Sequence, residues 1–180
     1  NKLLKKKGNI IFDQKIFQAK KLNNIAKSRK LKKYDFGNKK CFINILNIKN
    51  INNKRKVDFS IRNKKYTFTT SLIGMIQIKN LFFAILAAYL SKVKIKDILK
   101  SIEKIKPING RLEKVGNLKN RSKVILDYAH TPDALKTAIL NIRKEYPISK
   151  ISLVFGCGGD RDKDKRPEMG EIAKKYCDKI

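Results

Sequence analysis

The last third of the chain alternates strand-like and helix-like segments, and this order restricts the fold more than any other feature. Residues 124–128 and 151–155 are short apolar runs, typical of strands buried in a parallel sheet. Between them, a threonine N-cap followed by proline predicts a helix over residues 131–145. A glycine loop and an expected helix over residues 167–176 follow the second run. The order predicts a βαβ unit with one further helix.

Polar residues follow both expected strands at their carboxyl ends. Asp127 stands near the end of the first strand, and His130 comes just after it. The run Gly-Cys-Gly-Gly-Asp-Arg-Asp, residues 156–162, follows the second strand. A right-handed crossover would make the two strands parallel neighbours in one sheet. We therefore expect both polar clusters to open onto the same sheet edge, where α/β proteins bind ligands.

Each of these residues also has a purely structural interpretation. His130, the single histidine, could be a structural hydrogen-bonding group or a ligand-binding one. Asp127 could cap a turn or accept hydrogen bonds from a ribose. The glycine loop permits close backbone approach, but it is neither the dinucleotide fingerprint nor a phosphate loop. Arg161 could belong to a solvated loop or could bind a carboxylate through its planar guanidinium group.

The first two thirds of the chain also read as a mixture of strands and helices. Residues 49–56 are expected to be a polar loop, and residues 107–111 a linker at a domain boundary. The apolar helix 78–90 should be buried nearly all round, so the amide of Asn80 needs a partner. That partner is either a loop or the edge of a ligand base. The remaining expected elements are strands over 8–12, 41–46, 57–61, 66–70 and 112–115, and helices over 15–28 and 96–104.

The formal net charge of +29 would suit a polyanionic partner, so a basic nucleic-acid-binding module is the alternative of another class. The lysines are spread along the whole chain beside many Asn, Ile and Phe residues, which A/T-rich codons favour. No aromatic-rich recognition motif accompanies them. Three scattered cysteines fit a reducing compartment, and no apolar run is long enough to cross a membrane.

Four motifs together resemble the Mur ligase family, in particular its MurE type. Residues 127–134, Asp-Tyr-Ala-His-Thr-Pro-Asp-Ala, and the glycine loop with its continuation to residue 170 carry the strongest match. Asn-Gly-Arg-Leu-Glu at 109–113 resembles the family's hinge, and residues 70–80 resemble its Gly-x-Phe-Asn-x-x-Asn helix start. Gln77 and Asn109 depart from the usual asparagine and proline. Folylpolyglutamate synthases, which share the ligase fold, are the alternative within the class.

The resemblance implies an α/β fold of two parts. Residues 1–108 would be the C-terminal part of the central ATPase domain. Residues 109–180 would be the N-terminal part, the first βαβ half, of a Rossmann-like C-terminal domain. We expect the chain to be truncated at both ends, because the family's phosphate loop, carbamylated lysine and Asp-Asn-Pro-Arg motif are not in it. On this interpretation the chain alone would be inactive.

The implied activity is that of an ATP-dependent acid–amino-acid ligase of peptidoglycan synthesis. Such an enzyme adds meso-diaminopimelate or lysine to UDP-MurNAc-L-Ala-D-Glu through an acyl phosphate. ATP and Mg²⁺ are the implied cofactors, and the dipeptide and the diamino acid are the implied substrates. The resemblance further implies a cytoplasmic monomer with no membrane insertion and no specific nucleic acid.

Roles transferred by motif fall into a nucleotide group and an amino-acid group. Asn80 would meet the adenine and Asp127 the ribose hydroxyls. Arg111 and His130 would lie near the ATP phosphates and are the catalytic candidates. The carboxylate of the incoming amino acid would bind in the glycine loop, through Arg161 with Gly158, Gly159 and Asp160. No residue of the chain is assigned to a metal.

Overall fold

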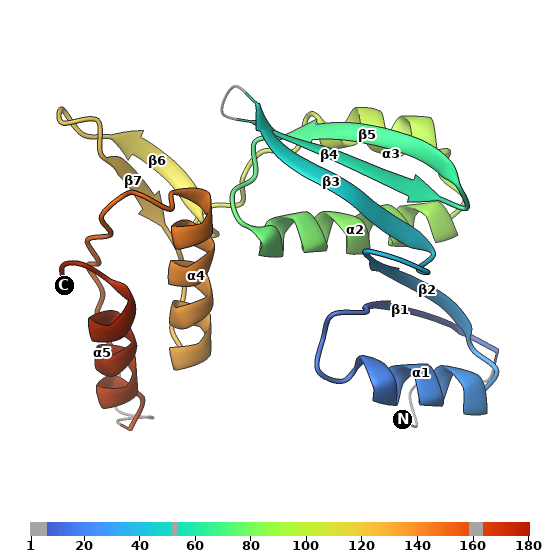
Figure 1. Cartoon of the computed structure of the whole chain (residues 1–180), viewed down its shortest axis with the longest axis horizontal. Helices are drawn as coiled ribbons and strands as arrows, with labels where there is room; N and C mark the ends of the chain where they lie inside the picture. Colours follow the sequence, from blue (N-terminus) through green and yellow to red (C-terminus); the bar gives the residue numbers. More distant parts are fainter. Residues whose placement is uncertain (1–6, 52–53, 159–163) are drawn as a thin grey trace. The chain divides into compact units, whose positions relative to one another are not determined.

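The computed structural model describes residues 7–51, 54–158 and 164–180, which form two compact units (Figure 1). The first unit comprises residues 1–71 and 79–105, and the second comprises residues 72–78 and 106–180. Each unit has its own hydrophobic core and is described separately. No helix of the described ranges is both long and apolar enough to span a bilayer.

The first unit is built on a five-stranded mixed sheet with the strand order β1-β2-β3-β4-β5. The first three strands run parallel, while β3, β4 and β5 form an antiparallel meander. The α/β class expected from the sequence is thereby confirmed. The strands are β1 Asn9–Asp13, β2 Lys32–Gly37, β3 Ile43–Ile51, β4 Lys54–Ile61 and β5 Lys64–Thr70.

Helix α2 supplies the centre of this unit's core. The Phe82 ring is fully buried, and its centroid lies 5.5 Å from those of Phe36 and Phe59 and 6.1 Å from that of Phe68. These three partners come from β2, β4 and β5, so one ring joins the sheet to the helix. The helices are α1 Ala19–Ser28, α2 Met75–Leu90 and α3 Ile95–Ile102.

Two buried carboxylates lie on neighbouring strands, Asp13 at the end of β1 and Asp35 within β2. Asp13 forms an ion pair with Lys79 of α2, with 2.6 Å between Oδ2 and Nζ. Asp35 accepts a hydrogen bond from the Phe42 amide at 2.9 Å and another from the Gln14 side chain. Burial alone would raise the pKa of Asp35, but these hydrogen bonds and nearby Lys33 outweigh it and lower the pKa. Each buried carboxylate thus has charged or hydrogen-bonding partners inside the unit, which offset the cost of burying it.

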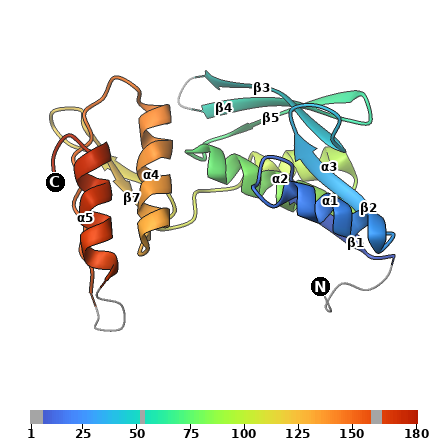
Figure 2. The ribbon, with the colours of Figure 1, turned by 60° about the horizontal axis from the view of Figure 1, so that its bottom comes forward.

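The second unit combines a hairpin with two packed helices. Strands β6, Glu113–Asn117, and β7, Lys123–Leu126, pair antiparallel. Helices α4, Pro132–Glu145, and α5, Lys165–Tyr176, lie side by side in Figures 1 and 2. They enclose a core formed by Leu135, Ile139, Ile151 and Met169.

The strand pairing of this unit differs from the expected parallel alignment of residues 124–128 with 151–155. In the part of the chain that the structure describes, β7 pairs with β6, and Ser152 forms an isolated parallel bridge with Lys179. The reason is that the backbone near Ile151 bonds elsewhere: Asp178 and Lys179 both donate to the Ile151 carbonyl. Leu126 is 52% exposed and Val154 98% exposed, so these runs are not buried on both faces.

Three further expectations need correction in the first unit. Strand β2 was not anticipated, because Lys32–Gly37 contains only two aromatic residues among polar ones. The expected loop over 49–56 is largely strand, since β3 extends to Ile51 and β4 begins at Lys54. Helix α2 is not buried all round: Asn80 is exposed, and Phe83 is 38% exposed. The helix buries only the face that meets the sheet.

Candidate functional site

A cluster of sequence-predicted residues forms in the second unit, where the segment before β6 meets the segment after β7. The Asp127 carboxylate joins these segments. Its Oδ2 accepts the Leu112 amide and its Oδ1 accepts the Ala129 amide, both at 2.9 Å. The Tyr128 amide also donates to the Gly110 carbonyl at 2.7 Å. Asp127 therefore has the turn-capping role that was one of its two interpretations, while each oxygen retains a further lone pair.

Arg111, Tyr128 and His130 lie in a row on the exposed side of this cluster. The Arg111 guanidinium carbon lies 5.5 Å from the centroid of the Tyr128 ring. The His130 ring centroid lies 5.3 Å from the Tyr128 centroid, and the two rings are tilted relative to each other. His130 Nδ1 is 3.2 Å from the Tyr128 carbonyl oxygen. A carbonyl can only accept, so this contact is a hydrogen bond only when Nδ1 carries the proton.

The amino end of α4 begins immediately after His130. Thr131 is the N-cap, with its hydroxyl accepting from the Ala134 amide at 3.3 Å, and Pro132 occupies the first helical position. The helix start predicted from the sequence is thus confirmed. Helix amino ends carry partial positive charge. Together with the Arg111 guanidinium, this end gives the cluster the electrostatic character of an anion-binding surface.

The opposite side of the cluster rests on the first turn of α2. The Gln77 side chain, which is 7% exposed, donates through Nε2 to the Arg111 carbonyl at 3.0 Å. The Met75 amide donates to Asn141 Oδ1 of α4 at 2.8 Å. In the sequence, Gln77 stands out only as a departure from a motif, and no local pattern marks Asn141. Both partners are more than thirty residues away in sequence, beyond the reach of local patterns.

The remaining predicted residues are Asn80 and those of the glycine loop. Asn80 belongs to the first unit, where its amide is exposed rather than buried as expected. Gly158 is exposed, and a Cβ added there would meet no atom within 4 Å. Gly159, Asp160 and Arg161 lie outside the described residues. No group of three or more His, Cys, Asp or Glu residues capable of holding a metal occurs within the described ranges.

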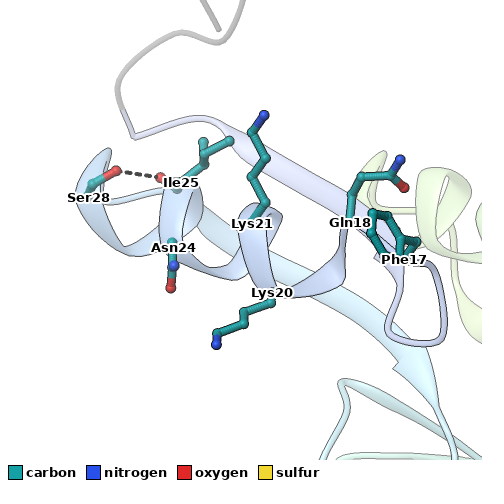
Figure 3. Close-up of a pocket in the computed structure, with 7 residues that line it drawn as sticks. All are labelled: Phe17, Gln18, Lys20, Lys21, Asn24, Ile25 and Ser28. Atoms are coloured by element: carbon teal, nitrogen blue, oxygen red, sulfur yellow. Dashed lines mark hydrogen bonds between the residues drawn. The ribbon is translucent and has the colours of Figure 1, made fainter.

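A pocket on α1 lies in the first unit and contains none of the predicted site residues (Figure 3). The side chains of its lysines point outward from the helix in the figure, and the Phe17 side chain is 98% exposed. The pocket is lined by Phe17, Gln18, Lys20, Lys21, Asn24, Ile25 and Ser28. It does not contribute to the candidate site.

Comparison with known proteins places the cluster in a matched domain. Residues 110–180 match the family model described as the glutamate ligase domain of Mur ligases. A UDP-N-acetylmuramoyl-L-alanyl-D-glutamate–2,6-diaminopimelate ligase of Rickettsia typhi is 39% identical over 127 residues, covering 70% of this chain and 25% of that protein. The enzyme of the same name from Buchnera aphidicola is 40% identical over 139 residues, covering 77% of this chain and 28% of its own. The chain thus spans about a quarter of the length of these relatives.

Solved structures agree on the fold. A 2,6-diaminopimelate ligase of the same name aligns with a TM-score of 0.64 at 22% identity, over 94% of this chain and 35% of that one. An FPGS–AMPPCP–folate complex aligns with a TM-score of 0.76 at 15% identity, over 99% and 43%. The fold is therefore common to both ligase types, while the sequence relatives above carry one name. By its matched domain and these relatives, the chain is similar to Mur ligases over residues 110–180 and to the named diaminopimelate ligases over 70–77% of its length.

Proposed function

We propose that the chain forms part of an ATP-dependent ligase that adds a diamino acid, diaminopimelate or lysine, to UDP-N-acetylmuramoyl-L-alanyl-D-glutamate. The observation that carries the proposal is the cluster of Arg111, Tyr128 and His130 held by Asp127 inside the matched domain. The names of the Rickettsia and Buchnera relatives support the substrate assignment. The reaction would take place in the cytoplasm, where nucleotide-linked precursors and ATP meet.

In this proposal the chemistry proceeds through an activated carboxylate. ATP would supply the phosphoryl group, which converts the side-chain carboxylate of glutamate into an acyl phosphate and releases ADP. The amine then forms the new C–N bond, loses a proton, and inorganic phosphate leaves. Mg²⁺ is expected to accompany ATP, and no residue of this chain is assigned to it. The chain's own contribution is to bind anionic oxygens and to align the two reactants.

Three residues of the cluster have roles in the nucleotide part of this proposal. Arg111 and His130 would bind phosphate oxygens, since a guanidinium and an imidazole beside a helix amino end attract anions. Asp127 would accept from ribose hydroxyls through the lone pairs that its two backbone hydrogen bonds leave over. Asn80, exposed on α2, would contact the adenine edge. In the relatives' full-length architecture these groups would act with further phosphate-binding elements.

Replacing Asp127 by alanine should weaken the binding of ATP to the chain by at least about tenfold. The charge-assisted hydrogen bonds that a carboxylate makes are worth about 1.5–3 kcal/mol each. The measurement is an NMR titration with ATP at physiological salt, with the amide spectrum as the check on folding. Asp133→Ala, which removes an acid of equal charge from the first turn of α4, is the control and should bind as the parent does. An unchanged ATP affinity in a folded Asp127→Ala chain would remove this residue from the nucleotide site.

Arg161 is proposed to bind the carboxylate of the incoming amino acid, with Gly158, Gly159 and Asp160 shaping its loop. Arg161→Ala should lower the affinity for meso-diaminopimelate by about tenfold or more, because a paired guanidinium–carboxylate contact is lost, and leave ATP binding unaltered. Isothermal titration of the chain with each ligand distinguishes the two effects. Lys174→Ala, which removes an exposed charge from α5, serves as the control. Equal losses for both ligands would contradict the assignment.

A further inference from the structure

The peptide group between Arg111 and Leu112 is held from both sides by side chains. Its carbonyl oxygen accepts from Gln77 Nε2 at 3.0 Å, and its N–H donates to Asp127 Oδ2 at 2.9 Å. The Arg111 amide in turn donates to the Ile108 carbonyl at 3.0 Å. All the backbone polar groups next to the Arg111 α-carbon are therefore fixed, and the direction in which its side chain leaves the backbone is fixed with them.

This orientation of the peptide is not one that the chain would adopt freely. Leu112 has φ +47°, in the left-handed region that a leucine rarely occupies, and it is 3% exposed. Turning the peptide over would release the unfavourable φ value, but it would also break both side-chain hydrogen bonds. The two bonds thus hold a conformation that local preferences oppose.

Gln77 is itself held in place. It lies in the first turn of α2, whose first amide, that of Met75, donates to Asn141 Oδ1 at 2.8 Å. The Asn141 amide nitrogen donates to the Thr137 carbonyl at 2.8 Å, which fixes the orientation of that side chain on α4. The first turn of α2 is therefore bonded to α4 through Met75 and Asn141, and to the Arg111 carbonyl through Gln77.

We propose that Gln77 is a positioning residue for Arg111, acting on the peptide that determines where the guanidinium can meet an anionic ligand. The inference rests on the proposed function, because it assigns the Arg111 guanidinium to the phosphates of ATP. A carbonyl oxygen needs a donor, which the glutamine amide supplies and a carboxylate would not. Since Gln77 is buried, water cannot readily replace the lost donor.

The experiment uses the full 180-residue chain and the variants Gln77→Met and Gln77→Glu. Methionine keeps an unbranched side chain of similar length, and glutamate keeps the shape, but both lack the donor. Gln18→Met, at an exposed glutamine whose side chain makes no capping hydrogen bond, is the matched control. Amide hydrogen exchange at Leu112 reports the peptide orientation. An NMR titration with ATP, following the Arg111 Nε–Hε signal, reports its effect on the guanidinium.

We expect both Gln77 variants to speed exchange at Leu112 by about tenfold and to weaken ATP binding by a similar factor, because one buried hydrogen bond is lost. Adding either substitution to Arg111→Ala should cause no further loss of ATP affinity, because Gln77 acts only through Arg111. Gln18→Met should change neither quantity. A general loss of fold would instead raise exchange throughout the second unit, and Gln77→Met, which buries no charge against the Arg111 carbonyl, is then the gentler test.

The outcomes separate the inference from the function on which it rests. If Arg111→Ala weakens ATP binding but the effects of Gln77→Met and Arg111→Ala simply add, the positioning role is wrong and the proposed function stands. Unchanged exchange at Leu112 in both Gln77 variants would also overturn the positioning role. If Arg111→Ala leaves ATP binding unchanged, the proposed nucleotide site itself is wrong.

Discussion

Replacing Phe82 by alanine is expected to destabilise the first unit by about 3–5 kcal/mol, the usual loss for a fully buried phenylalanine. The ring is 0% exposed and lies against Phe36, Phe59 and Phe68. These rings come from three strands, so they cannot all move inward to fill the space left behind. The cavity would persist, and its surface would cost free energy in addition to the lost transfer of the ring from water.

The adjacent phenylalanine provides the control for this prediction. Phe83 lies on the same helix, is 38% exposed, and touches the core through the edge of Phe36 at 4.9 Å between centroids. Phe83→Ala should therefore cost about 1–2 kcal/mol, because much less apolar surface returns to water. Urea unfolding followed by circular dichroism gives both free energies. Equal losses for the two variants would show that the core is not centred on Phe82.

Gly74→Ala is expected to destabilise the second unit by about 2–5 kcal/mol, from two separate causes. Gly74 has φ +83°, where any residue with a Cβ is strained. A Cβ at this position would also lie 2.6 Å from Leu112 Cδ1 and 3.2 Å from Asn141 Oδ1. Leu112 is buried and its backbone is held by Asp127, so it has little freedom to withdraw.

Gly116→Ala is the matched comparison, since a Cβ there meets no atom within 4 Å. It lies in β6 of the same unit, so an effect of removing glycine as such would appear in both variants. We expect Gly116→Ala to be neutral or slightly stabilising, because alanine has less conformational freedom in the unfolded chain. Thermal unfolding of both variants decides the matter. A Gly74→Ala chain as stable as the parent would mean that the backbone just before α2 is not packed against Leu112.

The sequence alone could predict the elements whose signals lie in a few neighbouring residues. Thr131 and Pro132 form a helix start by their own chemistry, and the structure confirms both positions. The gathering of Arg111, Asp127 and His130 follows from motifs within about twenty residues of each other, which the structure also brings together. The ligand-binding roles assigned to these residues, in contrast, depend on molecules that the chain does not contain, so they stay predictions.

Features that depend on distant partners could not be predicted. The pairing of β2 with β1 makes a strand of Lys32–Gly37, although its own residues are mostly polar. Which face of α2 is buried depends on where the sheet lies, and a nearly uniform apolar pattern does not contain that information. The contact between Gln77 and the Arg111 carbonyl spans 34 positions, and it involves a backbone group that every residue possesses.

The two backbone hydrogen bonds of Asp127 have a consequence for how variation among relatives should be interpreted. Leu112 and Ala129 each require an acceptor oxygen at this position, and asparagine offers only one. Purifying selection on folding would therefore preserve aspartate even in a descendant that had ceased to bind any nucleotide. An invariant aspartate at this position across a lineage would therefore indicate that the fold is retained, and would not by itself indicate nucleotide binding. Variation at the exposed Arg111 and His130, which the fold does not need in this way, would be the informative trace of a lost activity.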